Sequence, residues 1–168
     1  MKTFLRLTAS NDQKREPGDR GGLLFTMVLY SNPEWLSIVR AAVGRLTETL
    51  GFKAEHCRSI TRAVDEALAN IIRHSYSNRR DRPIAMYFRK EQRKQEGEVQ
   101  QGLEIILCDR GPVADATKWR GRPMSEIRPG GLGLNLIRDA MDIVEFSRKG
   151  DINRLRLVKY LAQASPAA

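Results

Sequence analysis

The chain has 168 residues, a length that suits one α+β or α/β domain with a single hydrophobic core. No apolar run approaches the roughly 20 residues of a membrane-spanning helix, and the N-terminus has too short an apolar stretch for a secretion signal, so we expect a cytoplasmic protein. The net charge of +9, from 29 Lys and Arg against 20 Asp and Glu, favours an acidic partner: nucleic acid, an anionic surface, an acidic protein or a nucleotide.

The first predicted element follows a polar N-terminal segment. Residues 1–22 are rich in charge and contain Pro17, which predicts a flexible segment ahead of a folded domain over residues 23–161. The domain opens with an apolar stretch at residues 23–30, which ends at a Ser-Asn-Pro turn and is typical of a strand. Residues 162–168 are expected to be a short C-terminal tail.

Two helices are expected next, followed by a pair of strands. The first helix is predicted over residues 33–50, where apolar residues recur at helical spacing until a glycine. The second is predicted over residues 53–75 and carries one apolar stripe. Apolar stretches at residues 84–88 and 103–107 predict a hairpin whose strands are joined by a solvated loop over the very polar residues 89–102.

The last part of the chain begins with a long irregular segment. Residues 110–130 contain several glycines, prolines and charges without a sustained period, and a loop of this length is usually functional or mobile. A helix at residues 132–141 and two strands at residues 143–147 and 153–160 are expected to follow, the strands joined by a Lys-Gly-Asp turn. This order of elements predicts a two-layer α+β sandwich, in which helices cover one face of a mixed, mostly antiparallel sheet.

The predicted second helix carries polar residues at a regular spacing. Glu66, Asn70 and His74 lie four residues apart, so on an α-helix they share one stripe. Glu66 and Asn70 lie at the edge of the apolar face, where they would line a cleft rather than fill the core. The competing interpretation is a solvated helix flank with surface hydrogen bonds, and a histidine near a helix end is common without any catalytic role.

An aspartate ends the predicted strand at residues 103–107. In the sequence Leu-Cys-Asp-Arg-Gly-Pro, Asp109 is followed by Gly111, which leaves the backbone free to turn sharply. A carboxylate in this place can accept a hydrogen bond from the exocyclic amine of a bound base. A plain strand-ending turn uses the same residue types, so both interpretations stay open for this motif taken alone.

Glycines run directly into the predicted helix at residues 132–141. Gly130, Gly131 and Gly133 precede an apolar helical pattern, and backbone N–H groups at such a helix start can cradle phosphates because no side chain blocks the approach. A hinge or a tight helix–sheet contact would also use glycine here. The segment lacks the Lys-Ser/Thr ending of a P-loop and follows no βαβ unit, so the Walker and Rossmann interpretations fail.

Together and in this order, the three motifs resemble those of a known family. Glu-Ala-x-x-Asn-x-x-x-His-x-Tyr, Asp-x-Gly and Gly-Gly-x-Gly-Leu-x-Leu-Ile are similar to the ATP-binding boxes of the GHKL superfamily, which has the Bergerat fold, and specifically to those of the small bacterial anti-sigma-factor serine/threonine kinases. The resemblance covers about residues 23–161. It implies a protein kinase that binds ATP and a sigma factor, and that phosphorylates an antagonist with a STAS-like fold in a partner-switching pathway.

The resemblance also implies a role for each motif. Asn70 would ligate Mg²⁺ bridging the phosphates of ATP, and Glu66 would be the general base toward the attacking hydroxyl. Asp109 would bind the adenine amino group, Gly111 would open the base pocket, and residues 113–129 would form a lid. The rest of the implied nucleotide-binding set, with glycines that meet the phosphates, is Arg73, His74, Gly130, Gly131, Leu132, Gly133 and Leu134.

The chain also departs from the family pattern. The family often has a phenylalanine shortly after the Asp-x-Gly box, where this chain has Val113 and Ala114. Neither residues 1–22 nor residues 89–102 match a part of the family with a known role. Arg40 matches a position that the family uses for contacts with protein partners, although an exposed helix arginine without a role is the more common case. Family members are often dimers, so a homodimer is compatible with the resemblance.

Two other functions compete with the kinase hypothesis. The chain could bind ATP without catalysis and act as a nucleotide-gated partner-switching module, in which case Glu66 would be dispensable for partner binding. It could also bind nucleic acid, as the net charge and the Asn-Arg-Arg-Asp-Arg sequence at residues 78–82 suggest. The scattered charge, the 7% aromatic content and the lack of a recognised DNA- or RNA-binding motif argue against direct nucleic-acid binding, and nothing predicts a membrane partner.

Overall fold

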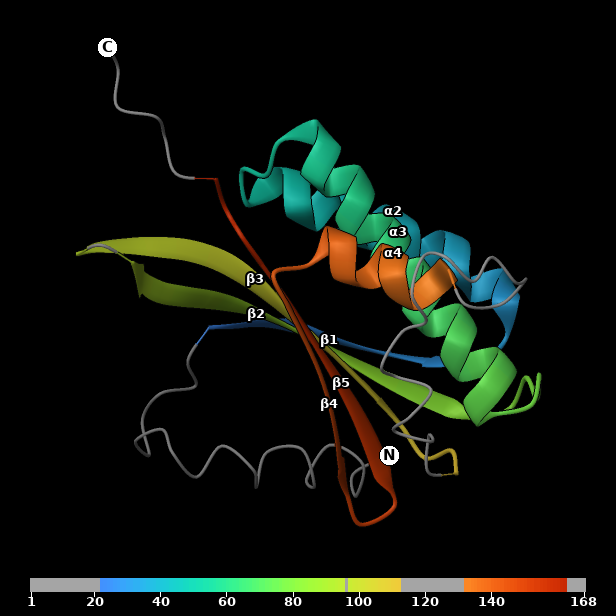
Figure 1. Cartoon of the computed structure of the whole chain (residues 1–168). Coiled ribbons are helices and arrows are strands. Elements are labelled where there is room, and N and C mark those ends of the chain that lie inside the picture. The colour runs from blue at the N-terminus through green and yellow to red at the C-terminus, as the bar shows by residue number, and fades with distance from the viewer. Residues whose placement is uncertain (1–21, 96, 113–131, 163–168) are drawn as a thin grey trace.

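A computed structural model of the chain describes residues 22–95, 97–112 and 132–162. They form an α+β structure in which helices lie over one face of a single five-stranded sheet (Figure 1), as the sequence predicts. The strand order is β1-β2-β3-β5-β4, every pair of neighbours is antiparallel, and β1 and β4 are the outer strands. The strands are β1 (Leu23–Tyr30), β2 (Pro83–Gln95), β3 (Glu98–Asp109), β4 (Ile143–Lys149) and β5 (Ile152–Tyr160).

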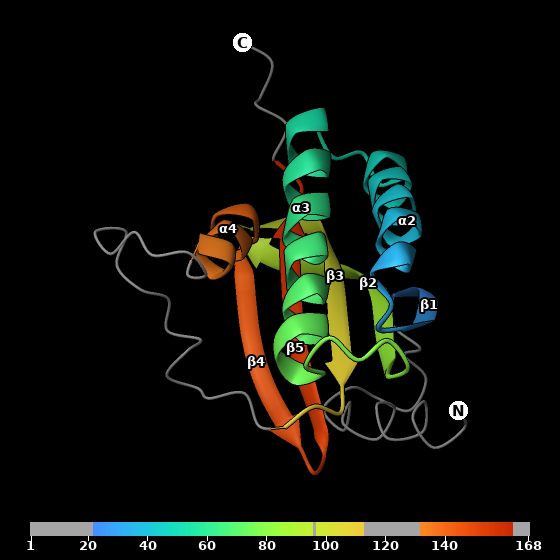
Figure 2. The same ribbon diagram turned by 90° about the vertical axis from the view of Figure 1, so that its right-hand side faces the viewer.

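The helices form the second layer. Figure 2 shows α3 between α2 and α4, and α3 packs against both. In the described part of the chain, no helix is long and apolar enough to cross a membrane. The helical elements are the 3₁₀ turn η1 (Pro33–Trp35), α2 (Leu36–Thr49), α3 (Ala54–Asn70), the π-helix η2 (Ile71–Ser75) and α4 (Leu132–Ala140).

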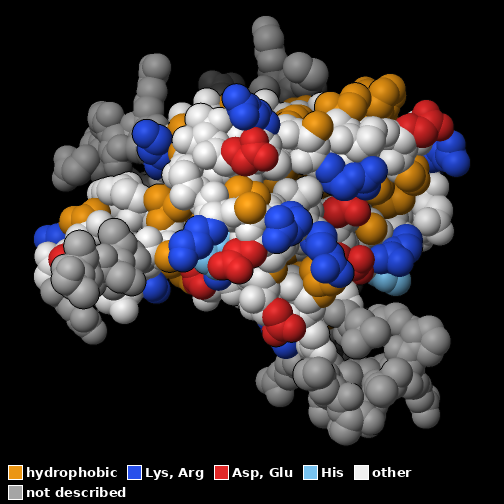
Figure 3. Space-filling model, turned by 90° about the horizontal axis from the view of Figure 1, so that it is seen from above, with side chains coloured by type: hydrophobic (Ala, Val, Ile, Leu, Met, Phe, Trp, Pro, Cys, Tyr) orange, Lys and Arg blue, Asp and Glu red, His pale blue; other side chains and the backbone are white. Residues whose placement is uncertain are grey.

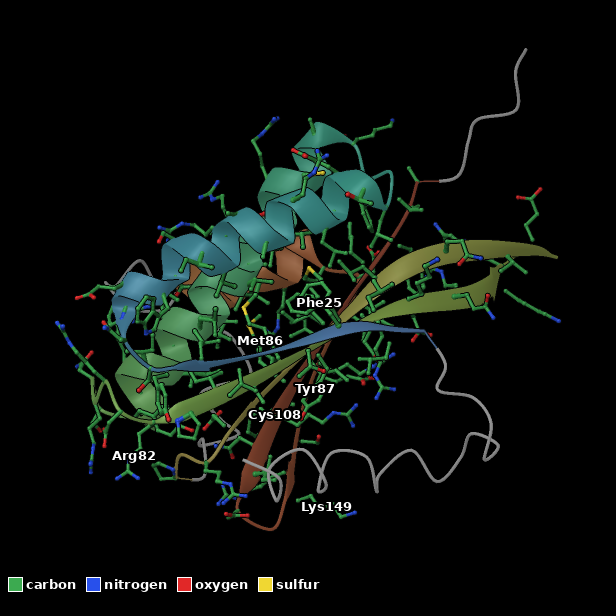
Figure 4. All side chains as sticks on the ribbon, turned by 180° about the vertical axis from the view of Figure 1, so that it is seen from behind. Phe25, Arg82, Met86, Tyr87, Cys108 and Lys149 are labelled. Atoms are coloured by element: carbon green, nitrogen blue, oxygen red, sulfur yellow. The ribbon has the colours of Figure 1, made fainter. Side chains whose placement is uncertain are left out.

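The hydrophobic core lies between the sheet and the helices. Because side chains alternate along a strand, Phe25 and Met86 point toward the helices, whereas Tyr87 and Cys108 lie on the opposite face of the sheet (Figure 4). The apolar stripe of α3 fills the middle of this layer, and Leu68 is completely buried. A second, smaller cluster of buried side chains lies on the face away from the helices and consists of Ala85, Tyr87, Ile106, Cys108 and Ile152.

The helix predicted over residues 33–50 begins as a 3₁₀ turn rather than as an α-helix. Asn32 is in an extended conformation, and its side chain accepts a hydrogen bond from the backbone N–H of Glu34 at 3.3 Å, as an N-cap does. Pro33 then occupies the first position of the turn, where no intrahelical donor is needed. At the other end, Gly51 adopts a φ of +85° and turns the chain toward α3.

The end of the predicted second helix differs from the expected α-helix. Residues Ile71–Ser75 form a π-helix, in which the backbone N–H of Tyr76 donates to the carbonyl of Ile71, five residues earlier, at 3.0 Å. The wider turn rotates the residues that follow Asn70. His74, which is predicted to share a stripe with Glu66 and Asn70, lies in this π-helix and is exposed.

The hairpin of β2 and β3 is longer than predicted. The expected strands are present, but the ladder continues into residues 89–102, predicted as a solvated loop: residues 91–95 pair with residues 98–102. Most of these side chains are exposed, so they carry no apolar pattern, while the backbone ladder continues regardless of side-chain type. The turn itself is tight and contains Gly97, whose φ is +86°.

The C-terminal elements agree with their predictions to within a few residues. α4 covers the helix expected at residues 132–141, and β4 and β5 form the expected hairpin with its turn at Gly150 and Asp151. The predicted segment 1–22, apart from its last residue, most of the irregular segment 110–130, and the tail 162–168, apart from its first residue, lie outside the described residues.

Candidate functional site

Glu66 and Asn70 lie together in the last turn of α3, at the edge of the buried face. Both are partly buried, and the side chain of Glu66 is 29% exposed. Arg73, one turn further on in η2, joins them: its Nη2 lies 3.1 Å from Oε1 of Glu66 and 3.2 Å from Oδ1 of Asn70. A carboxylate, an amide oxygen and a guanidinium from two successive helical turns are therefore gathered at one place.

The start of α4 lies directly against this group. A Cβ atom built on Gly133 would come within 2.6 Å of Cδ of Glu66, so no larger residue fits without moving the glutamate. The glycine motif thus brings a helix N-terminus beside the carboxylate of Glu66. The start of an α-helix is a place where backbone N–H groups can bind an anion.

Asp109 ends β3 and is buried, with 4% of its surface exposed. Its Oδ1 accepts hydrogen bonds from the backbone N–H of Gly111 at 2.7 Å and from Nδ2 of Asn153 on β5 at 2.9 Å. The hydroxyl of Ser75 also donates to this carboxylate. Because every one of these partners is a donor, the carboxylate can present only its remaining acceptor positions to a ligand.

Burial raises the pKa of the Asp109 carboxyl above its ordinary value. Desolvation is the largest cause, because it disfavours the charged form. The hydrogen bonds from Asn153, Gly111 and Ser75 and the positive charge of Arg148 act in the opposite direction. A carboxyl group shifted by burial in this way, beside convergent polar groups, is a frequent mark of a functional site.

The turn that follows β3 packs tightly against η2. A Cβ atom on Gly111 would lie 2.7 Å from the backbone oxygen of Ser75, so glycine is required at this contact. The hydroxyl of Tyr76 accepts a hydrogen bond from the backbone N–H of Arg110 at 2.8 Å and donates to the carbonyl of Pro83 at 2.8 Å. Burial raises the pKa of Tyr76 to about 12, so this hydroxyl stays protonated as a structural link between η2, β2 and β3.

The structure brings three of the predicted residues close together at the end of α3: Glu66, Asn70 and Arg73, with Gly133 against them. Asp109 and Gly111 contact Ser75, the last residue of η2, whereas Asn70 directly precedes its first residue. Leu134 is partly buried and packs against the core. Gly130 and Gly131 lie outside the described residues, and the side chain of Leu132 is not described.

Two residues of the site were missed by sequence reasoning. Asn153 is 1% exposed and contacts Asp109 directly, and Nη1 of Arg148 lies 2.6 Å from Oδ1 of Asn153. They lie more than 35 residues after Asp109 in the chain and belong to none of the three motifs. The register of β3 and β5 alone places Asn153 opposite Asp109.

The metal that the resemblance implies fits a site of this kind. Among the described residues, no group of three or more His, Cys, Asp and Glu side chains could hold a metal ion. Mg²⁺ in phosphate-binding sites usually takes one or two protein oxygens and completes its shell with phosphates and water. The amide oxygen of Asn70, beside the carboxylate of Glu66, is a donor of that type.

Basic and acidic side chains are interspersed over the helices. Figure 3, which looks down on this layer, shows Lys and Arg side chains mixed with Asp and Glu side chains instead of a continuous basic surface. Arg40 follows this pattern, because its Nη1 lies 2.9 Å from Oδ1 of Asp65 and so links α2 to α3. On the described part of this face, Lys and Arg side chains therefore lie close to Asp and Glu side chains.

Comparison with known proteins identifies the family of the chain. Residues 29–159 match the histidine kinase-like ATPase domain, so the chain belongs to this family and the predicted GHKL resemblance is confirmed. Within curated proteins, the chain is 26% identical over 145 residues to the serine-protein kinase RsbW of Oceanobacillus iheyensis, covering 82% of this chain and 86% of the relative. It is also 26% identical over 143 residues to the RsbW of Halalkalibacterium halodurans, covering 80% and 82%.

Two solved structures share the fold. The SiaB-SiaC complex from Pseudomonas aeruginosa contains a chain that superposes with a TM-score of 0.61 at 13% identity, covering 94% of this chain and 99% of that one. The RsbU and RsbW domains of a Mycobacterium tuberculosis protein give a TM-score of 0.55 at 13% identity, covering 84% of this chain. The matched region is 33% of the chain in that structure.

Proposed function

We propose that the chain is an ATP-dependent serine/threonine protein kinase of the anti-sigma type, which phosphorylates an antagonist protein in a partner-switching pathway. The observation that carries the proposal is the convergence of Glu66, Asn70 and the glycine start of α4 at one end of α3. A general base, a metal-ligating oxygen and a phosphate-binding helix start are the parts that phosphoryl transfer requires. The serine-protein kinase relatives support the same activity.

Asp109 would recognise the adenine of ATP, because its buried carboxylate offers an acceptor to the exocyclic amino group. The phosphates would lie along the start of α4 at Gly133, with the glycines at 130 and 131 continuing the contact. Mg²⁺, when bound, would neutralise charge on the phosphates, with Asn70 as its protein ligand. Arg73 would add a positive charge beside Asn70, where the phosphates need it.

Glu66 would act on the antagonist's hydroxyl group. As the serine or threonine oxygen bonds to the γ-phosphorus, the carboxylate of Glu66 accepts the hydroxyl proton, and the bond between the γ-phosphorus and the β–γ bridging oxygen breaks to leave ADP. The N–H groups at the start of α4 would hold the phosphates in line for this attack. Catalysis would therefore depend mainly on positioning and charge neutralisation.

The remaining partners follow from the same proposal. A sigma factor would be the protein released or bound as the antagonist is phosphorylated, and the antagonist would have a STAS-like fold. The protein would work in the cytoplasm and regulate transcription through this sigma factor, without direct contact with nucleic acid or membrane. A homodimer would be its working form, by analogy with the family.

Phosphotransfer from labelled ATP to STAS-domain proteins encoded near this chain tests the kinase proposal. We expect Glu66→Gln to lower the transfer rate by about 10²- to 10⁴-fold, the usual contribution of a general base, while ADP binding changes little. Asn70→Ala should abolish both transfer and the rise in melting temperature that Mg-ATP causes. Glu55→Gln, an exposed glutamate at the start of α3, is the matched control and should transfer phosphate normally.

Two outcomes would contradict the kinase proposal in different ways. If the wild-type protein binds Mg-ATP and its partner but transfers no phosphate, the chain is a nucleotide-gated binding module. If Mg-ATP leaves the melting temperature of the wild-type protein unchanged, the nucleotide site itself is wrong.

A further inference from the structure

Asn153 occupies a position that connects the base-recognising carboxylate to the rest of the sheet. It pairs with Asp109 across the β3–β5 ladder, and both side chains lie on the helix-facing side. Nδ2 of Asn153 lies 2.9 Å from Oδ1 of Asp109, 3.3 Å from the carbonyl oxygen of Gly111 and 3.4 Å from that of Pro112. One buried amide therefore holds both the aspartate and the turn that follows it.

Arg148 determines which way this amide points. Its Nη1 lies 2.6 Å from Oδ1 of Asn153 and 3.1 Å from the carbonyl oxygen of Gly111, and its Nε donates to the carbonyl of Gly150 at 3.0 Å. A guanidinium can only donate hydrogen bonds, so the atom of Asn153 that faces it must be the carbonyl oxygen. The amide nitrogen then faces three acceptors, which makes the reverse orientation unfavourable.

The orientation of the Asn153 amide affects the ionisation of Asp109. With its amide nitrogen toward Asp109, Asn153 stabilises the ionised carboxylate and opposes the effect of burial on its pKa, as Arg148 does through its charge. An ionised carboxylate surrounded by donors is an acceptor only, and it favours a ligand group that donates. The groups that act on the Asp109 carboxylate are Ser75 at the end of η2, Tyr76 directly after it, Gly111 in the turn, Asn153 on β5 and Arg148 on β4.

We infer that Arg148 and Asn153 are positioning residues for base recognition: Arg148 orients the Asn153 amide, and Asn153 holds Asp109 as an acceptor for the 6-amino group of adenine. The inference rests on the proposed nucleotide site, and it assigns to two residues of the β4–β5 hairpin the selectivity for an aminopurine. Neither residue needs to touch the nucleotide. Their effect should therefore depend on whether the base carries the amino group.

Binding of ADP and of purine riboside 5′-diphosphate, which lacks the 6-amino group, tests the inference by isothermal titration at neutral pH. The wild-type protein should bind ADP about tenfold or more tightly than purine riboside 5′-diphosphate. This is the affinity difference expected from one hydrogen bond to a charged group. Asn153→Ala and Arg148→Gln should each weaken ADP binding several-fold and leave the affinity for purine riboside 5′-diphosphate within about twofold. Arg154→Gln, on the neighbouring position of β5 but on the opposite face of the sheet, is the control and should keep the preference.

The possible results distinguish a failure of the positioning role of Arg148 and Asn153 from a failure of nucleotide binding as such. If both nucleotides weaken equally in Asn153→Ala and Arg148→Gln, the two residues have only a structural role and the inference is wrong. If Asn153→Ala does not fold, the exposed Arg148 still decides, because an unchanged ADP preference in Arg148→Gln also contradicts the inference. If the wild-type protein binds neither nucleotide, the proposed function fails and the inference fails with it.

Discussion

Burial of Asp109 makes the stability of the fold depend on pH. Asp109 is one of five buried polar or charged side chains among the described residues, and burial raises its pKa above the ordinary value of 3.8. The folded protein therefore binds this proton more tightly than the unfolded chain does. The stability that Asp109 contributes is complete below its unfolded pKa and is lost as the pH rises through the folded pKa.

Replacing this carboxylate by its neutral isostere should separate stability from binding. In Asp109→Asn the amide oxygen can still accept from Gly111 and Asn153, while the buried charge is gone, so the melting temperature without nucleotide should rise at neutral pH. The difference from the wild type should grow with pH from about 4 upward. ADP binding should be lost, because the remaining position becomes a donor.

Thermal melts from pH 4 to pH 8 and one ADP titration measure both effects. The control is Asp151→Asn, whose side chain is 64% exposed beside Arg110 and should leave both stability and binding unchanged. A lower melting temperature for Asp109→Asn at every pH would show that the charge itself stabilises the fold.

Asp109 was a candidate site residue on the sequence alone, but its partners Asn153 and Arg148 were not. The local pattern of Asp109 and Gly111 is also compatible with a plain turn, and the predicted role of Asp109 came from the resemblance of the three motifs together to the GHKL superfamily. Asn153 and Arg148 lie on another hairpin, and only the pairing of β3 with β5 brings them to the site. Such register depends on the whole sheet, and no spacing within one segment encodes it.

Two glycines hold the elements of the site at contact distance. Gly111 lets the turn after β3 approach η2, and Gly133 lets α4 approach α3, each at a place where a Cβ atom would overlap a neighbour. The two contacts differ in whether the neighbouring atoms could move away from a larger residue. The backbone of Ser75 meets Gly111, whereas the flexible side chain of Glu66 meets Gly133.

Gly133→Ala should therefore damage activity more than stability. The Glu66 carboxylate can rotate away from the new methyl group, and alanine gains about 1 kcal/mol of helix propensity over glycine, so the free energy of unfolding should change by less than about 1 kcal/mol. Phosphotransfer should fall at least about tenfold, since a misplaced base is inefficient. Urea unfolding measures the free energy of unfolding, and the transfer assay measures the rate of phosphotransfer.

Gly44→Ala in the interior of α2 is the matched control for that substitution. Its Cβ would meet Oγ1 of Thr61 at 3.9 Å, an ordinary contact, so stability should rise slightly and activity should stay unchanged. Full phosphotransfer by Gly133→Ala would contradict the placement of Glu66 as the base.

The elements themselves were predicted unevenly for a physical reason. Helices and strands that face the core were found because burial imposes a period on their side chains. The outer halves of β2 and β3 were taken for a loop because they extend beyond the helical layer (Figure 1) and have mostly exposed side chains. There the pairing rests on backbone hydrogen bonds and on contacts such as Arg93 Nε to Oε1 of Gln100 at 2.7 Å.

The face of the sheet away from the helices is stabilised by ion pairs as well as by its small apolar cluster. Arg156 on β5 contacts three carboxylates from three other strands: Glu104 at 2.5 Å, Glu145 at 3.0 Å and Glu91 at 3.7 Å. The side chain of Glu104 is only 8% exposed. Removing the arginine would leave this buried carboxylate without its closest cation.

Arg156→Met should lower the free energy of unfolding by about 3 kcal/mol, the usual cost of breaking a buried ion pair from one side. Adding Glu104→Gln should recover much of this loss, because the buried charge is then gone as well. Urea unfolding of the two single variants and the double variant measures the coupling. Arg45→Met removes an exposed pair with Glu48 and should change stability by less than about 0.5 kcal/mol.

Additive effects of the two substitutions would show that the pair does not act as a unit.

The sequence predicted the layers of the molecule, because the alternation of helices and hairpins allows few arrangements. It did not predict the charge cluster, since its four residues come from four strands and meet only in the finished sheet.

The two outer strands differ in a way that bears on the protein in concentrated solution. β4 carries Glu145, Arg148 and Lys149, and charges on an outer strand discourage a second molecule from adding to the sheet. β1 has the sequence Leu-Leu-Phe-Thr-Met-Val-Leu-Tyr without any charge, and Val28 and Tyr30 are 42% and 61% exposed. In a concentrated solution, the sequence of β1 therefore opposes edge-to-edge pairing of two sheets less than the charged sequence of β4 does.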